Sequence, residues 1–242
     1  GLAQKIVDSS NGALTAAFGD VSPNPDVTEI DACADVIRKN KHGFVVALGG
    51  GSAMDAAKAA ASVCMTDESI AEYHGTGKQL PKEHLPLIAV PTTSGTGSEV
   101  TQFAVVTDSK TGVKIPLIDE SLMPDIAILD PELVKSAPPF ITADTGLDVI
   151  THALEAYVSE TASDCSDCLA EKAAELAFEF LPRAYRNGYD IKARDKMHRA
   201  SCLAGMAFNL VNLGVNHGIA HALGAIFHIP HGRANALVLP YV

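Results

Sequence analysis

Residues 43–64 read GFVVALGGGSAMDAAKAAASVC and place three different patterns in direct succession. The apolar run 44–48 predicts a buried β-strand, and the three glycines after it allow a tight turn. The alanine-rich stretch from Ser52 onward predicts a helix directly after the turn. Strand, glycine turn and helix in this order are typical of a parallel sheet that is covered by helices.

Further elements of the same kind flank this stretch. Residues 27–40 (VTEIDACADVIRKN) predict a helix with Val27, Ile30, Ala34 and Ile37 on one apolar face. Other apolar runs predict strands at 85–91 (LPLIAVP), 103–108 (FAVVTD), 113–118 (VKIPLI) and 124–130 (PDIAILD). Because these runs are apolar throughout rather than strictly alternating, we expect them to form a parallel α/β sheet.

The pattern changes near the segment PPF, residues 138–140. Beyond it, long alanine-rich helical patterns cover 141–158, 163–185, 191–210 and 214–227. We therefore predict the fold class α/β plus all-α, with a Rossmann-like α/β domain over residues 1–136 and a helical domain over residues 137–242.

Composition excludes several classes of function. The net charge of -11 and the absence of any basic run argue against nucleic acid as a partner. No apolar stretch approaches the roughly 20 residues that span a bilayer, and no signal-peptide pattern opens the chain. Five cysteines fit a reducing compartment, so we expect a cytoplasmic protein. The pair Cys165 and Cys168 lies in a helical pattern, and we interpret it as structural.

Two polar, glycine-rich loops follow neighbouring apolar strands. Residues 49–52 (GGGS) close one strand and open a helix, where free backbone N–H groups and the helix dipole favour an anion. Residues 91–99 (PTTSGTGSE) follow the next strand. Loops at the carboxyl ends of parallel strands converge on a ligand crevice, and two in succession suit a dinucleotide. The alternative is a polar loop whose hydroxyls only cap a helix.

A carboxylate and several histidines recur at helical spacing in the second half. Asp148 and His152 lie four residues apart, and His217 and His221 have the same spacing, so each pair projects from one helix face. From spacing alone, these four residues form the predicted metal site. The donors suit zinc, ferrous iron, manganese or cobalt. Gly218 stands where a zinc-protease motif requires glutamate, which excludes that class.

Four long motifs together resemble the iron-containing, metal-dependent alcohol dehydrogenases: GGGSAMDAAK, PTTSGTGSEVT, GLDVITHALEAYVS and HGIAHALGAIFHIPHGRANALVLP. The resemblance implies a dinucleotide-binding domain, a helical domain and a metal in the cleft between them. It implies the metal ligands Asp148, His152, His217 and His231, with Fe²⁺ or Zn²⁺ as the metal. His221 then lies near the nicotinamide instead of binding the metal.

The resemblance also implies a set of NAD contacts. Gly49, Gly50, Gly51 and Ser52 would hold the pyrophosphate, and the remaining contacts would be Asn24, Asp55, Thr92, Thr93, Thr96 and Lys114. Full members of the family begin with one more strand, which discriminates NAD from NADP, and end with further helices. We therefore expect a fragment whose missing strand exposes apolar surface, and NADP is not excluded.

The implied activity is hydride transfer between NAD(H) and a short primary alcohol or aldehyde, such as ethanol, propanol or propanediol, in a homo-oligomer. The metal would act as a Lewis acid, and His221 would pass the alcohol proton to solvent or only pack against the cofactor. One alternative is a non-redox lyase of the dehydroquinate synthase type, whose anionic substrate would require more basic residues near the ligands. Another is an oligomerisation module of a fermentative enzyme.

Overall fold

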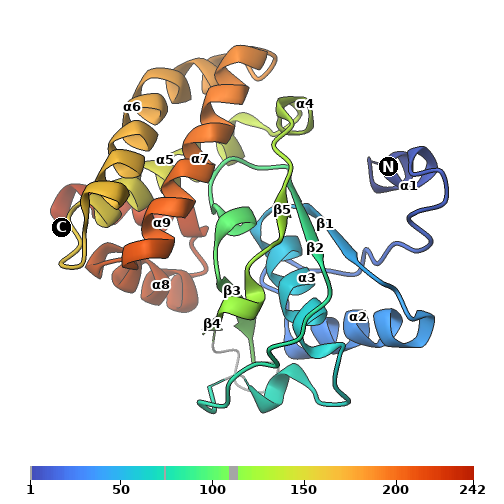
Figure 1. Ribbon diagram of the computed structural model, residues 1–242. Coiled ribbons are helices and arrows are strands. Elements are labelled where there is room, and N and C mark those ends of the chain that lie inside the picture. Colours follow the sequence, from blue (N-terminus) through green and yellow to red (C-terminus); the bar gives the residue numbers. More distant parts are fainter. Residues whose placement is uncertain (1, 74, 109–113) are drawn as a thin grey trace.

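The computed structural model describes residues 2–73, 75–108 and 114–242. An α/β half comes first along the chain and a helical half follows it, in agreement with the predicted fold class (Figure 1). The short helix α1 (Leu2–Ser9) buries none of its residues.

The parallel sheet has the strand order β1-β2-β5. Strands β1 (Val45–Gly49) and β2 (Leu87–Pro91) pair in parallel along their whole length, with Ala47 opposite Ala89. Helix α3 (Gly51–Val63) connects them, as residues 43–64 predict. The last strand, β5, covers only Ile126–Ala127, much less than the expected 124–130.

Two of the expected strands lie outside this sheet. Strands β3 (Phe103–Thr107) and β4 (Lys114–Ile118) pair with each other in antiparallel orientation, with Val105 opposite Pro116. The expectation of parallel strands is therefore wrong for this pair; Val113, which the expected strand included, lies outside the described residues. A parallel connection needs a dozen or more residues, and the short link from Thr107 to Lys114 permits only a hairpin.

The helices of the first half pack on one apolar cluster. Helix α2 (Val27–Asn40) begins with a capping box formed by Asp26 and Glu29, and it buries Ile30, Ala34 and Ile37 against α3. The predicted apolar face is confirmed for these three residues, and Val27 packs partly buried against the same cluster. This cluster fixes α3, whose N-terminus carries the glycine-rich turn.

The helical half contains α5 (Pro139–Tyr157), α6 (Asp164–Arg186), α7 (Ile191–Val211), α8 (Val215–Phe227) and α9 (His231–Val238), preceded by the short α4 (Pro131–Val134). Four of these agree with the predicted ranges to within two residues, whereas α9 was not anticipated. Alanines and larger apolar residues bury one cluster between α5, α6 and α7. Cys165 and Cys168 are exposed and free in the first two turns of α6. Within the described ranges no single helix has the length and apolarity to cross a membrane. Helices α7 and α8 together meet both criteria, but as a pair that is bent by 107°.

The loop after β2 packs tightly against the helical half. A Cβ atom on Gly95 would lie 2.6 Å from the Thr145 Cβ on α5. The Ser94 hydroxyl lies 3.0 Å from Nδ1 of the buried His198 on α7. These contacts hold residues 92–97 between the sheet and the helices, where the histidine-bearing helices also meet.

Candidate metal and dinucleotide site

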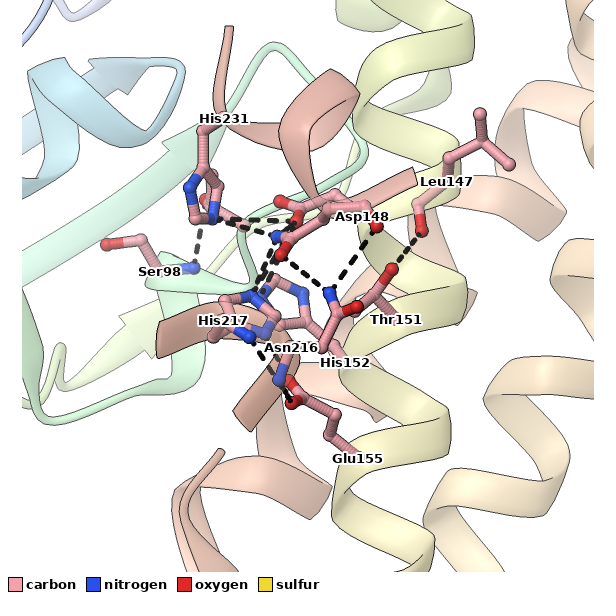
Figure 2. Close-up of polar contacts among 11 residues, drawn as sticks. Ser98, Leu147, Asp148, Thr151, His152, Glu155, Asn216, His217 and His231 are labelled. Carbon is pink, nitrogen blue, oxygen red and sulfur yellow. Dashed lines mark hydrogen bonds and ion pairs between the residues drawn. The ribbon is translucent and has the colours of Figure 1, made fainter. Parts of the chain in front are cut away.

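The structure brings Asp148, His152, His217 and His231 together in one cluster (Figure 2). One donor atom of each residue lies within 4.8 Å of all the others. The Nε2 atoms of His231, His217 and His152 lie 3.5, 3.8 and 4.0 Å from Asp148 Oδ1. Two donors come from α5, one from the first turn of α8 and one from the first residue of α9.

This donor set fits a divalent cation. Tetrahedral bonds of about 2.0–2.2 Å place neighbouring donor atoms about 3.4 Å apart, close to the separations in the cluster. Asp148, His152 and His217 are almost fully buried, whereas the His231 side chain is 41% exposed. The cluster is therefore closed on the side of α5 and open beside His231, as a site that must admit a substrate requires.

The protonation states also fit metal binding. Burial lowers the pKa of His152 from 6.5 to about 4, so its imidazole is neutral at pH 7. Burial opposes the charge on Asp148, but His152, His231, His217 and the Asn235 amide outweigh it and hold the pKa of Asp148 below its usual value. A charged carboxylate and a neutral imidazole are the forms that bind a divalent cation.

His221 does not belong to the cluster. It is exposed on α8, with its ring centroid 5.9 Å from that of His217 and 5.1 Å from that of His231. The cluster therefore contains His231 and not His221, which was the fourth member of the set predicted from spacing alone. Spacing along α8 cannot reveal this, because His231 belongs to another helix that packs on α5.

Gly232 permits that packing of α9 on α5. A Cβ atom on Gly232 would lie 2.1 Å from the Asp144 carbonyl oxygen and 3.3 Å from the Asp148 Cβ. Only a glycine lets the first turn of α9 approach the backbone of α5 so closely. The neighbouring His231 thereby comes within 3.5 Å of Asp148.

Asn235 lies at the centre of the cluster and was missed in the sequence. Its Nδ2 donates to Asp148 Oδ1 at 2.6 Å and lies 3.0 Å from His217 Nε2 and 3.2 Å from His231 Nε2. Its Oδ1 accepts a hydrogen bond of 2.9 Å from Asn216 Nδ2. The available signal was its spacing, four residues after His231 on the same helix.

Glu155 was also missed, although it continues the spacing of Asp148 and His152 along α5. Its carboxylate accepts from the backbone N–H groups of Asn216 at 2.8 Å and His217 at 3.3 Å, and it pairs with Nδ1 of the His217 ring. Burial opposes the charge, but these hydrogen bonds, above all the one to the His217 ring, hold the pKa of Glu155 below its usual value.

The two glycine-rich loops lie against each other, as a shared ligand crevice requires. A Cβ atom on Gly51 would lie 2.8 Å from Thr96 Cγ2, and one on Gly50 would lie 3.4 Å from Thr93 Oγ1. The Thr92 N–H donates to the Gly49 carbonyl oxygen at 2.8 Å. Gly49 has a φ of +154°, and a Cβ atom there would lie 2.6 Å from the Ala53 Cβ.

Asn24 forms hydrogen bonds with Ser52 and Lys114, two other residues that are predicted to contact the cofactor. Its backbone N–H donates to the Ser52 hydroxyl at 3.2 Å, and its Oδ1 accepts from Lys114 Nζ at 2.8 Å. Burial lowers the pKa of Lys114. These three residues form a polar rim beside the N-terminus of α3, where an anion is favoured.

Asp55 has protein partners on both carboxylate oxygens. Oδ1 accepts from the Ser98 hydroxyl at 2.7 Å, and Oδ2 accepts from the Val105 N–H at 3.1 Å. Burial raises the pKa of Asp55. The carboxylate thus ties α3 to the loop after β2, and Figure 2 places Ser98 of that loop beside His231.

Comparison with known proteins identifies the family. Residues 1–131 match the family model described as iron-containing alcohol dehydrogenase, and residues 142–242 match the C-terminal model of the Fe-containing alcohol dehydrogenase family. The 1-propanol dehydrogenase PduQ of Citrobacter freundii is 50% identical over 225 residues, which cover 93% of this chain and 57% of the relative. PduQ of Salmonella typhimurium is 48% identical, with 98% of this chain and 62% of the relative covered.

A solved structure extends the likeness. The sulfoacetaldehyde reductase of Bifidobacterium kashiwanohense in complex with NAD⁺ is 52% identical and superposes with a TM-score of 0.97, covering 100% of this chain and 64% of that protein. The chain therefore spans less than two thirds of the length of each of these three relatives.

Proposed function

We propose that this chain, which belongs to the iron-containing alcohol dehydrogenase family, catalyses the NAD-dependent interconversion of short primary alcohols and their aldehydes. The observation that supports the proposal most strongly is the cluster of one carboxylate and three imidazoles within 4.8 Å, next to two packed glycine-rich loops. Metal donors and nucleotide loops that meet in one place fit hydride chemistry on an alcohol.

The proposed ligands are Asp148, His152, His217 and His231, with Fe²⁺ or Zn²⁺ as the metal. A bound metal supplies Lewis acidity and NAD supplies the hydride acceptor. One carboxylate and three neutral imidazoles carry a single negative charge, so they hold a divalent cation without cancelling its charge. The partly exposed His231 leaves that side of the cluster accessible to a substrate.

The cofactor is proposed to bind along the packed loops. Gly49, Gly50, Gly51 and Ser52 would hold the pyrophosphate at the N-terminus of α3, because a glycine turn lets the phosphates approach the backbone. The remaining proposed contacts are Asn24, Asp55, Thr92, Thr93, Thr96 and Lys114. His221, exposed and stacked on His231, is proposed to carry the substrate proton toward solvent.

The proposed substrate is a short, uncharged alcohol such as 1-propanol, because both PduQ relatives are named for it. A sulfonated aldehyde is the second candidate, which the relative named sulfoacetaldehyde reductase favours. Initial rates with NADH for propanal and sulfoacetaldehyde, measured on the same metal-loaded protein, separate the two candidates.

The decisive test of the metal site is His217→Ala combined with metal analysis. We expect this variant to lose stoichiometric metal and turnover. His84→Ala is the matched control, because His84 precedes β2 at the end of the sheet away from the glycine-rich loops. Retained metal and activity in His217→Ala would contradict the proposed site.

We also propose a cytoplasmic homo-oligomer. All five cysteines are free, which suits a reducing compartment. The outer face of α6 exposes Phe178 and Tyr185, which fits contact with another copy. Light scattering of the purified protein tests the oligomer, and a monomer at every concentration would contradict it.

A further inference from the structure

We propose that Glu155 is a positioning residue that uses its two carboxylate oxygens for different tasks: one starts helix α8 and the other sets the tautomer of His217. The proposal rests on the proposed metal site, because His217 is one of its ligands. It assigns a role to a buried carboxylate outside the ligand set, 7% exposed on α5.

The oxygen Oε1 replaces a missing helix cap. The N-cap position of α8 is Gly214, which has no side chain to accept from the first backbone N–H groups. Oε1 of Glu155 accepts from the N–H groups of Asn216 and His217 instead, at 2.8 and 3.3 Å. A Cβ atom on Gly214 would lie 2.9 Å from the same oxygen, so the absence of a side chain there makes room for it. A carboxylate at a helix N-terminus also interacts favourably with the helix dipole.

The oxygen Oε2 acts on the ring of His217. It pairs with Nδ1 of that ring (Figure 2), and both side chains are buried. An ionised carboxylate only accepts hydrogen bonds, so Nδ1 must carry the proton. In a neutral imidazole the lone pair then resides on Nε2, which is the atom that faces Asp148 at 3.8 Å. Glu155 thereby presents His217 in the only neutral tautomer that can bind a metal through Nε2.

One face of α5 thus organises three of the four proposed donors. Asp148 and His152 project from it directly. Glu155 lies one turn further along α5 and fixes the position and tautomer of His217, which belongs to the neighbouring helix α8. A change at Glu155 should therefore affect metal affinity through His217, whereas a purely structural carboxylate would affect only the stability of α8.

Glu155→Gln separates the two tasks. The amide oxygen can still accept from the backbone of α8, but the amide nitrogen donates to Nδ1 and forces the proton of the ring onto Nε2. We expect zinc affinity, measured by competition with a chelator, to fall about 10- to 100-fold, as for other partners of metal-binding histidines. The thermal midpoint of the metal-free variant should stay near that of the parent protein. Glu179→Gln, exposed on α6, is the matched control and should change neither quantity.

Nitrogen-15 NMR of the histidine rings reads the tautomer directly. We expect a proton on Nδ1 of His217 in the parent protein and on Nε2 in Glu155→Gln. A proton on Nε2 in the parent protein overturns the proposal even if the variant fails to fold, and so does unchanged zinc affinity in a folded Glu155→Gln. Zinc binding by His217→Ala at parent affinity would instead overturn the proposed metal site itself.

Discussion

Gly97 and Gly205 are in backbone contact: a Cβ atom on Gly97 would lie 2.6 Å from the Gly205 Cα. Gly97 belongs to the loop after β2 and has a φ of 63°, whereas Gly205 lies inside α7. The two glycines therefore join the α/β half to the helical half directly beside Ser98, which holds Asp55. A side chain at either position would separate the loop from the helix.

Gly205→Ala should consequently destabilise the protein. The new Cβ would lie 2.9 Å from both the Cα and the carbonyl oxygen of Gly97, which are backbone atoms that cannot rotate away. Alanine favours helix by about 1 kcal/mol over glycine, yet overpacking costs about 1–3 kcal/mol and should dominate. Urea unfolding measures the difference. Gly218→Ala, where a Cβ meets nothing within 4 Å, should be neutral or stabilising, and equal behaviour of the two variants would contradict the proposed overpacking.

Lys58 supports the same region from inside the α/β half. Its buried Nζ donates to the carbonyl oxygens of Thr101 and Phe103 at 2.8 and 3.0 Å, and it offsets the charge of Asp55. Lys58→Met should leave these acceptors without a donor and lower the free energy of unfolding by about 2–4 kcal/mol.

Chemical denaturation of Lys58→Met tests this expectation. The control is Lys39→Met, whose side chain is 77% exposed and which should change stability by less than about 0.5 kcal/mol. A loss at Lys58 no larger than that of the control would show that the buried ammonium contributes no net stability.

Local pattern explains which parts of the fold were predictable. Helices α2 and α5 to α8 carry their apolar periodicity within the element, and Asp26, Ser163 and Asp190 cap α2, α6 and α7, so these ranges follow from sequence. The antiparallel pairing of β3 with β4 follows from the short link between them rather than from their apolar pattern, whereas the packing of α9 on α5 depends on contacts between distant segments. For the same reason the choice of His231 over His221 needed either a family resemblance or the structure.

The supporting residues show the limit of motif reasoning. Glu155 and Asn235 carry no metal-ligand signature beyond their helical spacing from His152 and His231, and their roles become visible through contacts with His217 on another element. Lys58 lies in an alanine-rich helix that predicts a solvent-exposed lysine as readily as a buried one. Such roles are set by tertiary packing, which short-range spacing does not encode.

His198 should make the protein sensitive to acid. Burial lowers its pKa from 6.5 to about 4, so the unfolded chain takes up the proton first as pH falls. Stability is therefore complete above pH 6.5 and is lost progressively between pH 6.5 and 4. At pH 5 the loss should reach about 2 kcal/mol, at 1.36 kcal/mol per pH unit.

The contribution of His198 can be isolated with His198→Asn in metal-free protein. Asparagine retains a polar atom near the Ser94 hydroxyl but does not titrate in this range. We expect the difference in unfolding free energy between pH 7 and pH 5 to shrink by about 2 kcal/mol in the variant. The same pH dependence in both proteins would assign the acid sensitivity to other groups.

For Asn235→Ala we predict a rise in zinc affinity, the opposite of the fall predicted for Glu155→Gln. Its amide nitrogen lies 2.6 Å from Asp148 Oδ1, 3.0 Å from His217 Nε2 and 3.2 Å from His231 Nε2. A cation with bonds of about 2.0–2.2 Å to the same atoms needs the same space, so the amide and the metal compete. Asn235→Ala removes a stabilising donor from the metal-free protein, which costs about 1–2 kcal/mol, but removes nothing that a bound metal uses. Zinc affinity should therefore rise about 10-fold, since 1.4 kcal/mol corresponds to that factor.

The control is Asn209→Ala on α7. It removes an amide oxygen that accepts a hydrogen bond from the Gln102 backbone N–H, and it should leave zinc affinity unchanged. Weaker zinc binding by Asn235→Ala would show that the amide supports the bound metal rather than competing with it.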